Sequence, residues 1–189
     1  KYFNIDYPIE ITTFADVPAN TGLGSSSAFA VGLVNALFAL EGKLASKYQI
    51  ASIAAKIEID LLGRKIGKQD HFACCYGNIN NLVFKSNESV EINPIVASTK
   101  IIKKLEDNII LFYTNQKRNS ESVLKNQFKI KKNQFIELNR MKDLVKVSQN
   151  MILNKNFNIK NFGKLLDKNW KIKKEINKLS SNKSIDKYY

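Results

Sequence analysis

The most constraining feature of this sequence is a glycine- and serine-rich segment, residues 18–27, which reads Pro-Ala-Asn-Thr-Gly-Leu-Gly-Ser-Ser-Ser. It lies between residues 9–14, whose alternating β-branched pattern predicts a strand, and the apolar run 28–40, which predicts a buried helix. Closely spaced glycines let a backbone approach a ligand, and a helix N-terminus presents unpaired N–H groups to phosphate oxygens. The segment lacks the Gly-Lys-Ser/Thr of a Walker A loop and the G-x-G-x-x-G spacing of a dinucleotide site. It predicts either a phosphate-binding loop of another kind or a glycine turn with a serine N-cap.

A second group of polar residues follows further along the chain. Glu58 stands near the end of an expected helix, and Lys68 and Asp70 belong to the stretch Gly-Lys-Gln-Asp. Phosphoryl transfer to a hydroxyl group needs a carboxylate near the acceptor and a metal ion that neutralises the phosphate oxygens. Glu58 and Asp70 could supply these two functions, and Lys68 could stabilise charge in the transition state. The alternatives are a solvated glutamate, a solvated lysine and an aspartate that caps a turn.

The remaining pattern predicts an α+β protein. Ser46 and Gln49 have the capping-box spacing, and apolar residues recur at helical intervals from there to Gly63. Strand-rich and helix-rich stretches follow one another without strict β-α-β alternation. We also expect a polar turn into a short helix or bend at 67–72, strands at 79–84 and 108–114, a hairpin or connection at 85–98, and helices at 120–131, 133–153 and 159–179.

Charge divides the chain near Ser98. Residues 1–98 hold 8 Lys and Arg against 9 Asp and Glu, whereas residues 99–189 hold 22 against 8, so the second part carries the whole positive excess. We therefore expect two domains, 1–98 and 99–189. A cationic part can attract nucleic acid or phosphorylated small molecules. Because no basic run with interleaved aromatic residues is present, solvated helix faces are the favoured reading and nucleic-acid binding is unlikely.

Hydropathy and the cysteines indicate whether the chain enters a membrane and in which compartment it is expected. The longest apolar stretch, 28–40, falls short of the ~20 residues that span a bilayer, so we expect no membrane partner. Cys74 and Cys75 are adjacent, which suits neither a structural disulfide nor a C-x-x-C metal site. We expect a reducing, cytoplasmic location. The first residues show neither an initiator Met nor a signal-peptide pattern, so we expect the chain to be a piece of a longer protein.

The order and spacing of these motifs resemble the GHMP kinases, the family named for galactokinase, homoserine kinase, mevalonate kinase and phosphomevalonate kinase. In that family Pro-x-x-x-Gly-Leu-Gly-Ser-Ser is the ATP phosphate loop, so the resemblance implies ATP and Mg²⁺ as cofactors. It assigns Mg²⁺ coordination to Ser26 and Glu58, and the catalytic aspartate to Asp70. It implies an ATP-binding N-terminal part and a helix-rich C-terminal part. The residues that it places in the phosphate loop are Pro18, Gly22, Leu23, Gly24, Ser25, Ser26 and Ser27.

The sequence looks most like one branch of that family, the D-glycero-D-manno-heptose 7-phosphate kinases. The resemblance suggests that Arg118 holds the sugar's 7-phosphate in a bidentate grip, with surface placement as the alternative. His71 stands where the branch usually has Gln, and we interpret it as a turn residue, with contact to substrate as the alternative. The resemblance implies N-terminal strands before Lys1 and a late Gly-rich loop after Tyr189, and we expect residues 1–189 to lack both. The segments that carry the similarity are 57–63, 66–70, 111–114, 162–170 and 184–188.

The sequence therefore predicts an ATP- and Mg²⁺-dependent sugar-phosphate kinase, or part of one. Backbone amides of residues 22–27 would cradle the phosphates, and Asp70 would orient or deprotonate the acceptor hydroxyl. One alternative is a non-catalytic remnant that folds around the loop without binding sugar. The other, less favoured, is a nucleic-acid-binding protein built on the basic part.

Overall fold

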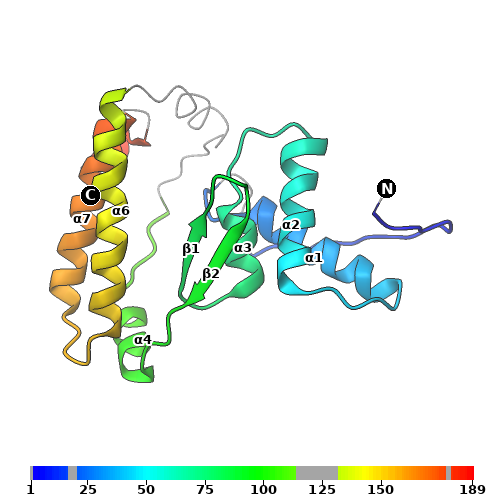
Figure 1. Ribbon diagram of the computed structural model, residues 1–189, viewed down its shortest axis with the longest axis horizontal. Helices are drawn as coiled ribbons and strands as arrows, with labels where there is room; N and C mark the ends of the chain where they lie inside the picture. Colours follow the sequence, from blue (N-terminus) through cyan, green and yellow to red (C-terminus); the bar gives the residue numbers. More distant parts are fainter. Residues whose placement is uncertain (1, 17–20, 114–131, 178–179) are drawn as a thin grey trace. The chain divides into compact units, whose positions relative to one another are not determined.

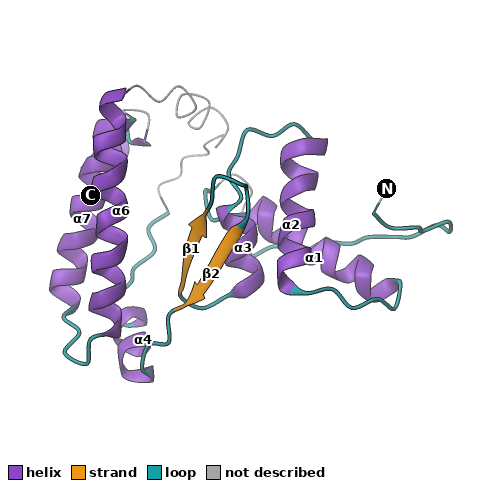
Figure 2. Cartoon of the chain, in the orientation of Figure 1, coloured by secondary structure: helices purple, strands orange, loops and turns teal. Residues whose placement is uncertain are grey.

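The computed structural model describes residues 2–16, 21–113, 132–177 and 180–189. Over these ranges the chain is a mixed α/β protein with a small two-stranded sheet, which confirms the expected fold class (Figures 1 and 2). The described residues form two compact units, one up to Asn78 and one from Ile79 onward. The domain boundary near Ser98 was inferred from charge and stays a prediction.

Helix α1 (Ser25–Leu40) supplies one wall of the first unit's core. Its buried residues Ser27, Ala30 and Val34 recur at helical spacing, so one face of the helix is buried. The helix ends where Gly42 adopts φ 65° and the Lys43 amide donates to the carbonyl of Phe38, the bonding pattern of a Schellman motif. This end confirms the glycine stop that the sequence predicts.

Helix α2 (Lys47–Lys56) begins at the predicted capping box. The Gln49 amide donates to the Ser46 hydroxyl over 3.2 Å, and the Ser46 amide donates to the Gln49 side chain over 2.9 Å. The helix continues into a π-helical turn, η1 (Ile57–Leu61), before the chain reverses into α3 (Gln69–Tyr76). Helices α1, α2 and α3 pack against one another (Figure 1). The core between α1 and α2 is formed by Ala30, Val34, Ile50 and Ala54.

The second unit contains a β-hairpin and helices. Strands β1 (Asn80–Phe84) and β2 (Val90–Pro94) pair antiparallel, which confirms the expected strand and hairpin. Helices α6 (Lys132–Leu153) and α7 (Ile159–Ile176) lie side by side (Figure 2) and match the expected helices closely. The core of this unit is formed by Ile101, Leu105, Ile152 and Phe157. The described residues of this unit also form α4 (Thr99–Glu106) and α8 (Lys183–Tyr188), which the sequence pattern does not predict.

Two expected strands are wrong. Residues 9–14 and the described part of 108–114 form no strand, and side chains such as Phe14, 94% exposed, lie in solvent. A β-branched pattern forms a strand only where another strand accepts its backbone hydrogen bonds, and the described sheet contains β1 and β2 alone. The helix expected at 120–131 lies outside the described residues.

Neither expectation about membrane or disulfide is contradicted. No helix among the described residues is long and apolar enough to cross a bilayer. Cys74 and Cys75 are both free thiols, as their adjacent positions predict.

Candidate functional site

The backbone at the start of α1 is set by two glycines. Gly22 and Gly24 adopt φ 78° and 71°, the left-handed region in which a side chain is strained. Gly24 is the N-cap residue, and no side chain caps the first turn of α1. The alternative of a serine N-cap is therefore wrong, because Ser25 is already the first helical residue. The first-turn amides of α1 are left without a side-chain cap, as an anion-binding helix terminus requires.

The three serines that follow differ in their environments. Ser25 and Ser26 are exposed, whereas Ser27 is buried and faces the interior of the unit. The Ser27 hydroxyl donates to Oε2 of Glu58 over 3.3 Å. The first turn of α1 therefore links the glycine loop directly to the predicted metal ligand. Pro18 lies outside the described residues.

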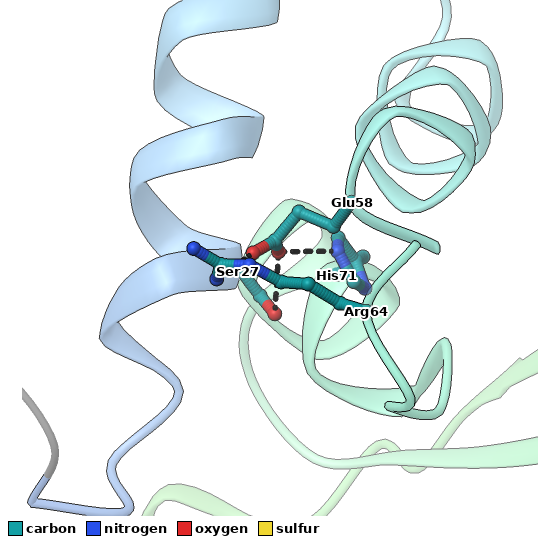
Figure 3. Close-up of polar contacts among 4 residues, drawn as sticks. All are labelled: Ser27, Glu58, Arg64 and His71. Atoms are coloured by element: carbon teal, nitrogen blue, oxygen red, sulfur yellow. Dashed lines mark hydrogen bonds and ion pairs between the residues drawn. The ribbon is translucent and has the colours of Figure 1, made fainter. Parts of the chain in front are cut away.

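Glu58 is the centre of a buried polar cluster (Figure 3). It lies on the π-turn η1 and is only 3% exposed. Nε2 of His71 lies 2.8 Å from Oε2, and a guanidinium nitrogen of Arg64 lies 2.7 Å from Oε1. A carboxylate removed from water needs such partners, because an unpaired buried charge is strongly destabilising. The structure thus excludes the reading of Glu58 as a solvated helix residue.

Asp70 lies in the first turn of α3 and faces the glycine loop. A Cβ atom placed on Gly24 would lie 3.4 Å from Oδ2 of Asp70, so the carboxylate lies against the start of α1. Lys68 precedes α3 at its N-cap position and is half-buried. The fold brings together Gly24, Glu58 and Asp70, which are far apart in the sequence. Arg118 lies outside the described residues, and its role stays a prediction.

His71 is not the turn residue that the sequence suggested. It lies inside α3, is 0% exposed and contacts Glu58, while its Nδ1 is buried without a hydrogen-bond partner in the described structure. The sequence pattern also gives no sign that Arg64 pairs with Glu58. Neither contact follows from helical spacing, because Arg64 and His71 come after Gly63, where the chain leaves the helix that carries Glu58.

Asp70 also affects its neighbour on α3. Burial raises the pKa of the Cys74 thiol, and the negative charge of Asp70 raises it further. Cys74 follows Asp70 by four residues, so the two side chains share one face of the helix. The thiol is therefore less reactive than a free cysteine at neutral pH.

Few side chains at this site could hold a metal ion. Among the described residues, no three His, Cys, Asp or Glu side chains gather into a metal-binding group. Mg²⁺ is commonly bound through one or two carboxylates together with substrate phosphates and water. Glu58 supplies one carboxylate, and Ser26 adds an exposed hydroxyl at the same helix terminus. This oxygen donor set suits Mg²⁺.

Comparison with known proteins shows which sequences this chain resembles. Residues 1–78 match the family model for the GHMP kinases N terminal domain. This part of the chain is similar to the N-terminal domain of the GHMP kinases. The match covers the first unit of the structure and includes the glycine loop, Glu58 and Asp70.

Proteins similar to this chain match it across both units. It is 30% identical over 181 residues to the D-glycero-alpha-D-manno-heptose 7-phosphate kinase of Campylobacter jejuni, covering 94% of this chain and 52% of that protein. It is 26% identical over 190 residues to the bifunctional fucokinase/GDP-fucose pyrophosphorylase of Arabidopsis thaliana, covering 96% and 17%. The crystal structure of a D-glycero-D-manno-heptose 1-phosphate kinase from Bacteroides thetaiotaomicron superposes with a TM-score of 0.63 at 27% identity, covering 86% and 47%. The chain thus spans about half the length of the heptose kinases that it matches.

Proposed function

We propose that this chain is the nucleotide-binding part of an ATP-dependent sugar-phosphate kinase. The observation that carries the proposal is the convergence of Gly24, Glu58 and Asp70 at the N-terminus of α1. A phosphate-binding helix terminus, a carboxylate for the metal and a second carboxylate for the acceptor are the parts that phosphoryl transfer needs. The family match and the sugar kinases among the relatives support it.

Each part of the site has a role in this proposal. The amides of residues 22–27 bind the phosphates, and the two positive-φ glycines let these oxygens come close to the backbone. Ser26 and Glu58 hold Mg²⁺, which when bound neutralises charge on the β- and γ-phosphate oxygens. Asp70 orients the acceptor hydroxyl and takes its proton. Lys68, at the start of α3, stabilises negative charge on the transferred group.

The substrate that we propose is a heptose phosphate. This choice rests on the heptose kinases to which the chain is similar. Arg118 would bind the substrate's phosphate group, since a guanidinium group matches phosphate in a bidentate geometry. An enzyme that consumes ATP and carries two free cysteines is expected in the cytoplasm.

Sugar-dependent ADP release tests the proposal. The purified chain is mixed with ATP, Mg²⁺ and D-glycero-D-manno-heptose 7-phosphate, and ADP is measured with and without the sugar. Asp70→Asn is expected to lower turnover by a factor of about 10²–10⁴, the usual contribution of a positioned general base. Asp60→Asn is the matched control, because Asp60 is an exposed carboxylate on the neighbouring turn η1. Equal turnover in wild type and Asp70→Asn refutes the role of Asp70.

The alternative is a non-catalytic remnant that binds nucleotide without transferring phosphate. It is favoured by one observation: both oxygens of the Glu58 carboxylate are already paired with protein groups, those of Ser27, His71 and Arg64. The same assay separates the two, because a remnant releases no sugar-dependent ADP. Activity in the wild-type chain excludes the remnant.

A further inference from the structure

The two oxygens of the Glu58 carboxylate are held in different ways. Oε2 lies 2.8 Å from Nε2 of His71 and accepts from Ser27, and both of these partners are buried. Oε1 accepts from Arg64 over 2.7 Å, and the Arg64 side chain is 42% exposed (Figure 3). One oxygen is therefore fixed by the core, and the other is paired with a cation that borders solvent.

Backbone hydrogen bonds place Arg64 next to Glu58. The π-turn closes with the amide of Leu62 donating to the carbonyl of Ile57, and Gly63 then reverses the chain at φ 66°. The amide of Arg64 donates to the carbonyl of Glu58 over 3.0 Å. Single π-turns inside helices occur often at functional sites. Here the turn places a guanidinium group beside one carboxylate oxygen, and the Arg64 side chain stays 42% exposed.

We propose that Arg64 is an exchangeable counter-ion of Glu58, which competes with Mg²⁺ for Oε1. The inference rests on the proposed function, in which Glu58 is a metal ligand. A buried carboxylate is strongly destabilised without a partner, so a cation is needed on Oε1 whenever the metal is not bound. Two cations on one oxygen repel each other across a few ångströms. The half-exposed Arg64 leaves at low cost, because water solvates its guanidinium group, while His71 and Ser27 keep the carboxylate oriented.

The direction in which nucleotide affinity changes when the Arg64 charge is removed distinguishes this competition from other roles of an arginine near phosphate. If Arg64 competes with the metal, removing its charge strengthens the binding of Mg²⁺–nucleotide. If Arg64 instead binds the phosphates, the same change weakens nucleotide binding both with and without Mg²⁺. If Arg64 only stabilises the fold, nucleotide affinity does not rise.

The test is the dissociation constant of fluorescent ADP, measured on the whole 189-residue chain in excess Mg²⁺ and again in EDTA. Arg64→Gln is expected to bind ADP about fivefold more tightly in Mg²⁺, with no gain in EDTA. Arg64→Lys retains the charge and is expected to stay within about twofold of wild type. Lys65→Gln is the matched control, since it removes a positive charge from the adjacent exposed residue. Circular dichroism checks that each variant folds.

The outcomes separate the two proposals. Unchanged or weaker ADP binding by Arg64→Gln in Mg²⁺ overturns the exchange while leaving the nucleotide site intact, and so does an equal gain in Lys65→Gln. Absence of ADP binding in both wild type and Arg64→Gln overturns the proposed function together with the exchange. If Arg64→Gln does not fold, phenylglyoxal labelling of the wild type decides. Faster labelling of Arg64 in Mg²⁺ and ADP than in EDTA and ADP supports the exchange, and equal or slower labelling overturns it.

Discussion

Gly24 offers a sharp test of the geometry at the start of α1. It adopts φ 71°, and a Cβ atom on it would lie 3.4 Å from Oδ2 and 3.5 Å from Cβ of Asp70. A side chain in the left-handed region costs about 1–2 kcal/mol. The contacts with Asp70 are ordinary van der Waals distances, so they add little. We therefore expect Gly24→Ala to lower the free energy of unfolding by about 1–2 kcal/mol without preventing folding.

Gly22→Ala is the matched control for this change. Gly22 has φ 78°, and a Cβ atom on it would have nothing within 4 Å. The backbone cost is the same, so the two variants are expected to differ in stability by less than about 0.5 kcal/mol. They differ in where the added methyl group lies, because at position 24 it lies against the Asp70 carboxylate. We expect turnover at saturating ATP to fall further in Gly24→Ala than in Gly22→Ala.

Urea denaturation followed by circular dichroism measures both free energies, with the slope of each transition compared to confirm equal exposure on unfolding. A change below about 0.3 kcal/mol in either variant shows that the left-handed backbone is not adopted there. A loss above about 3 kcal/mol in Gly24→Ala alone shows that Asp70 is packed more tightly than the structure has it. Either result contradicts the geometry described for Gly24 and Asp70.

Other contacts in the first unit predict further outcomes. Ser46→Ala removes the hydroxyl that accepts from Gln49 and should cost about 1 kcal/mol of stability in urea denaturation; no loss contradicts the capping box. Glu58→Leu leaves the buried His71 without its 2.8 Å partner and should cost about 2–4 kcal/mol, and a stabilised variant contradicts the buried cluster. Asp70→Asn removes a charge that raises the pKa of Cys74, so the thiolate forms at lower pH. The pH at which iodoacetamide labels Cys74, followed by mass spectrometry, should therefore fall in this variant. An unchanged pH profile would show that the Asp70 charge does not act on the thiol.

Helices α1 and α2 are predictable from the sequence because their signals are local. The capping box at Ser46 and the glycine stop at Gly42 each involve residues within a few positions of one another, and both are confirmed. The strand at 9–14 was mispredicted for the opposite reason. Its pattern is local, but a strand depends on a partner elsewhere, and the described residues provide none for it.

At the candidate site, too, local motifs are predictable from the sequence and long-range contacts are not. The motifs alone indicate Glu58 and Asp70 as site residues. The partners of Glu58 could not be read in this way, because His71 and Arg64 meet it only after the chain reverses at Gly63. An isolated histidine or arginine carries no sequence signal for burial or pairing. The cluster therefore became visible only in three dimensions.

Calorimetric titration of the folded chain with ATP and Mg²⁺ shows whether the start of α1 binds a nucleotide together with its metal ion. Ser26→Ala serves as the comparison, because Ser26 is exposed on the first turn of α1 and its loss should disturb the ligand set more than the fold. We expect saturable, Mg²⁺-dependent binding of ATP that Ser26→Ala weakens. A folded chain that shows no binding, or that binds equally well after Ser26→Ala, contradicts it.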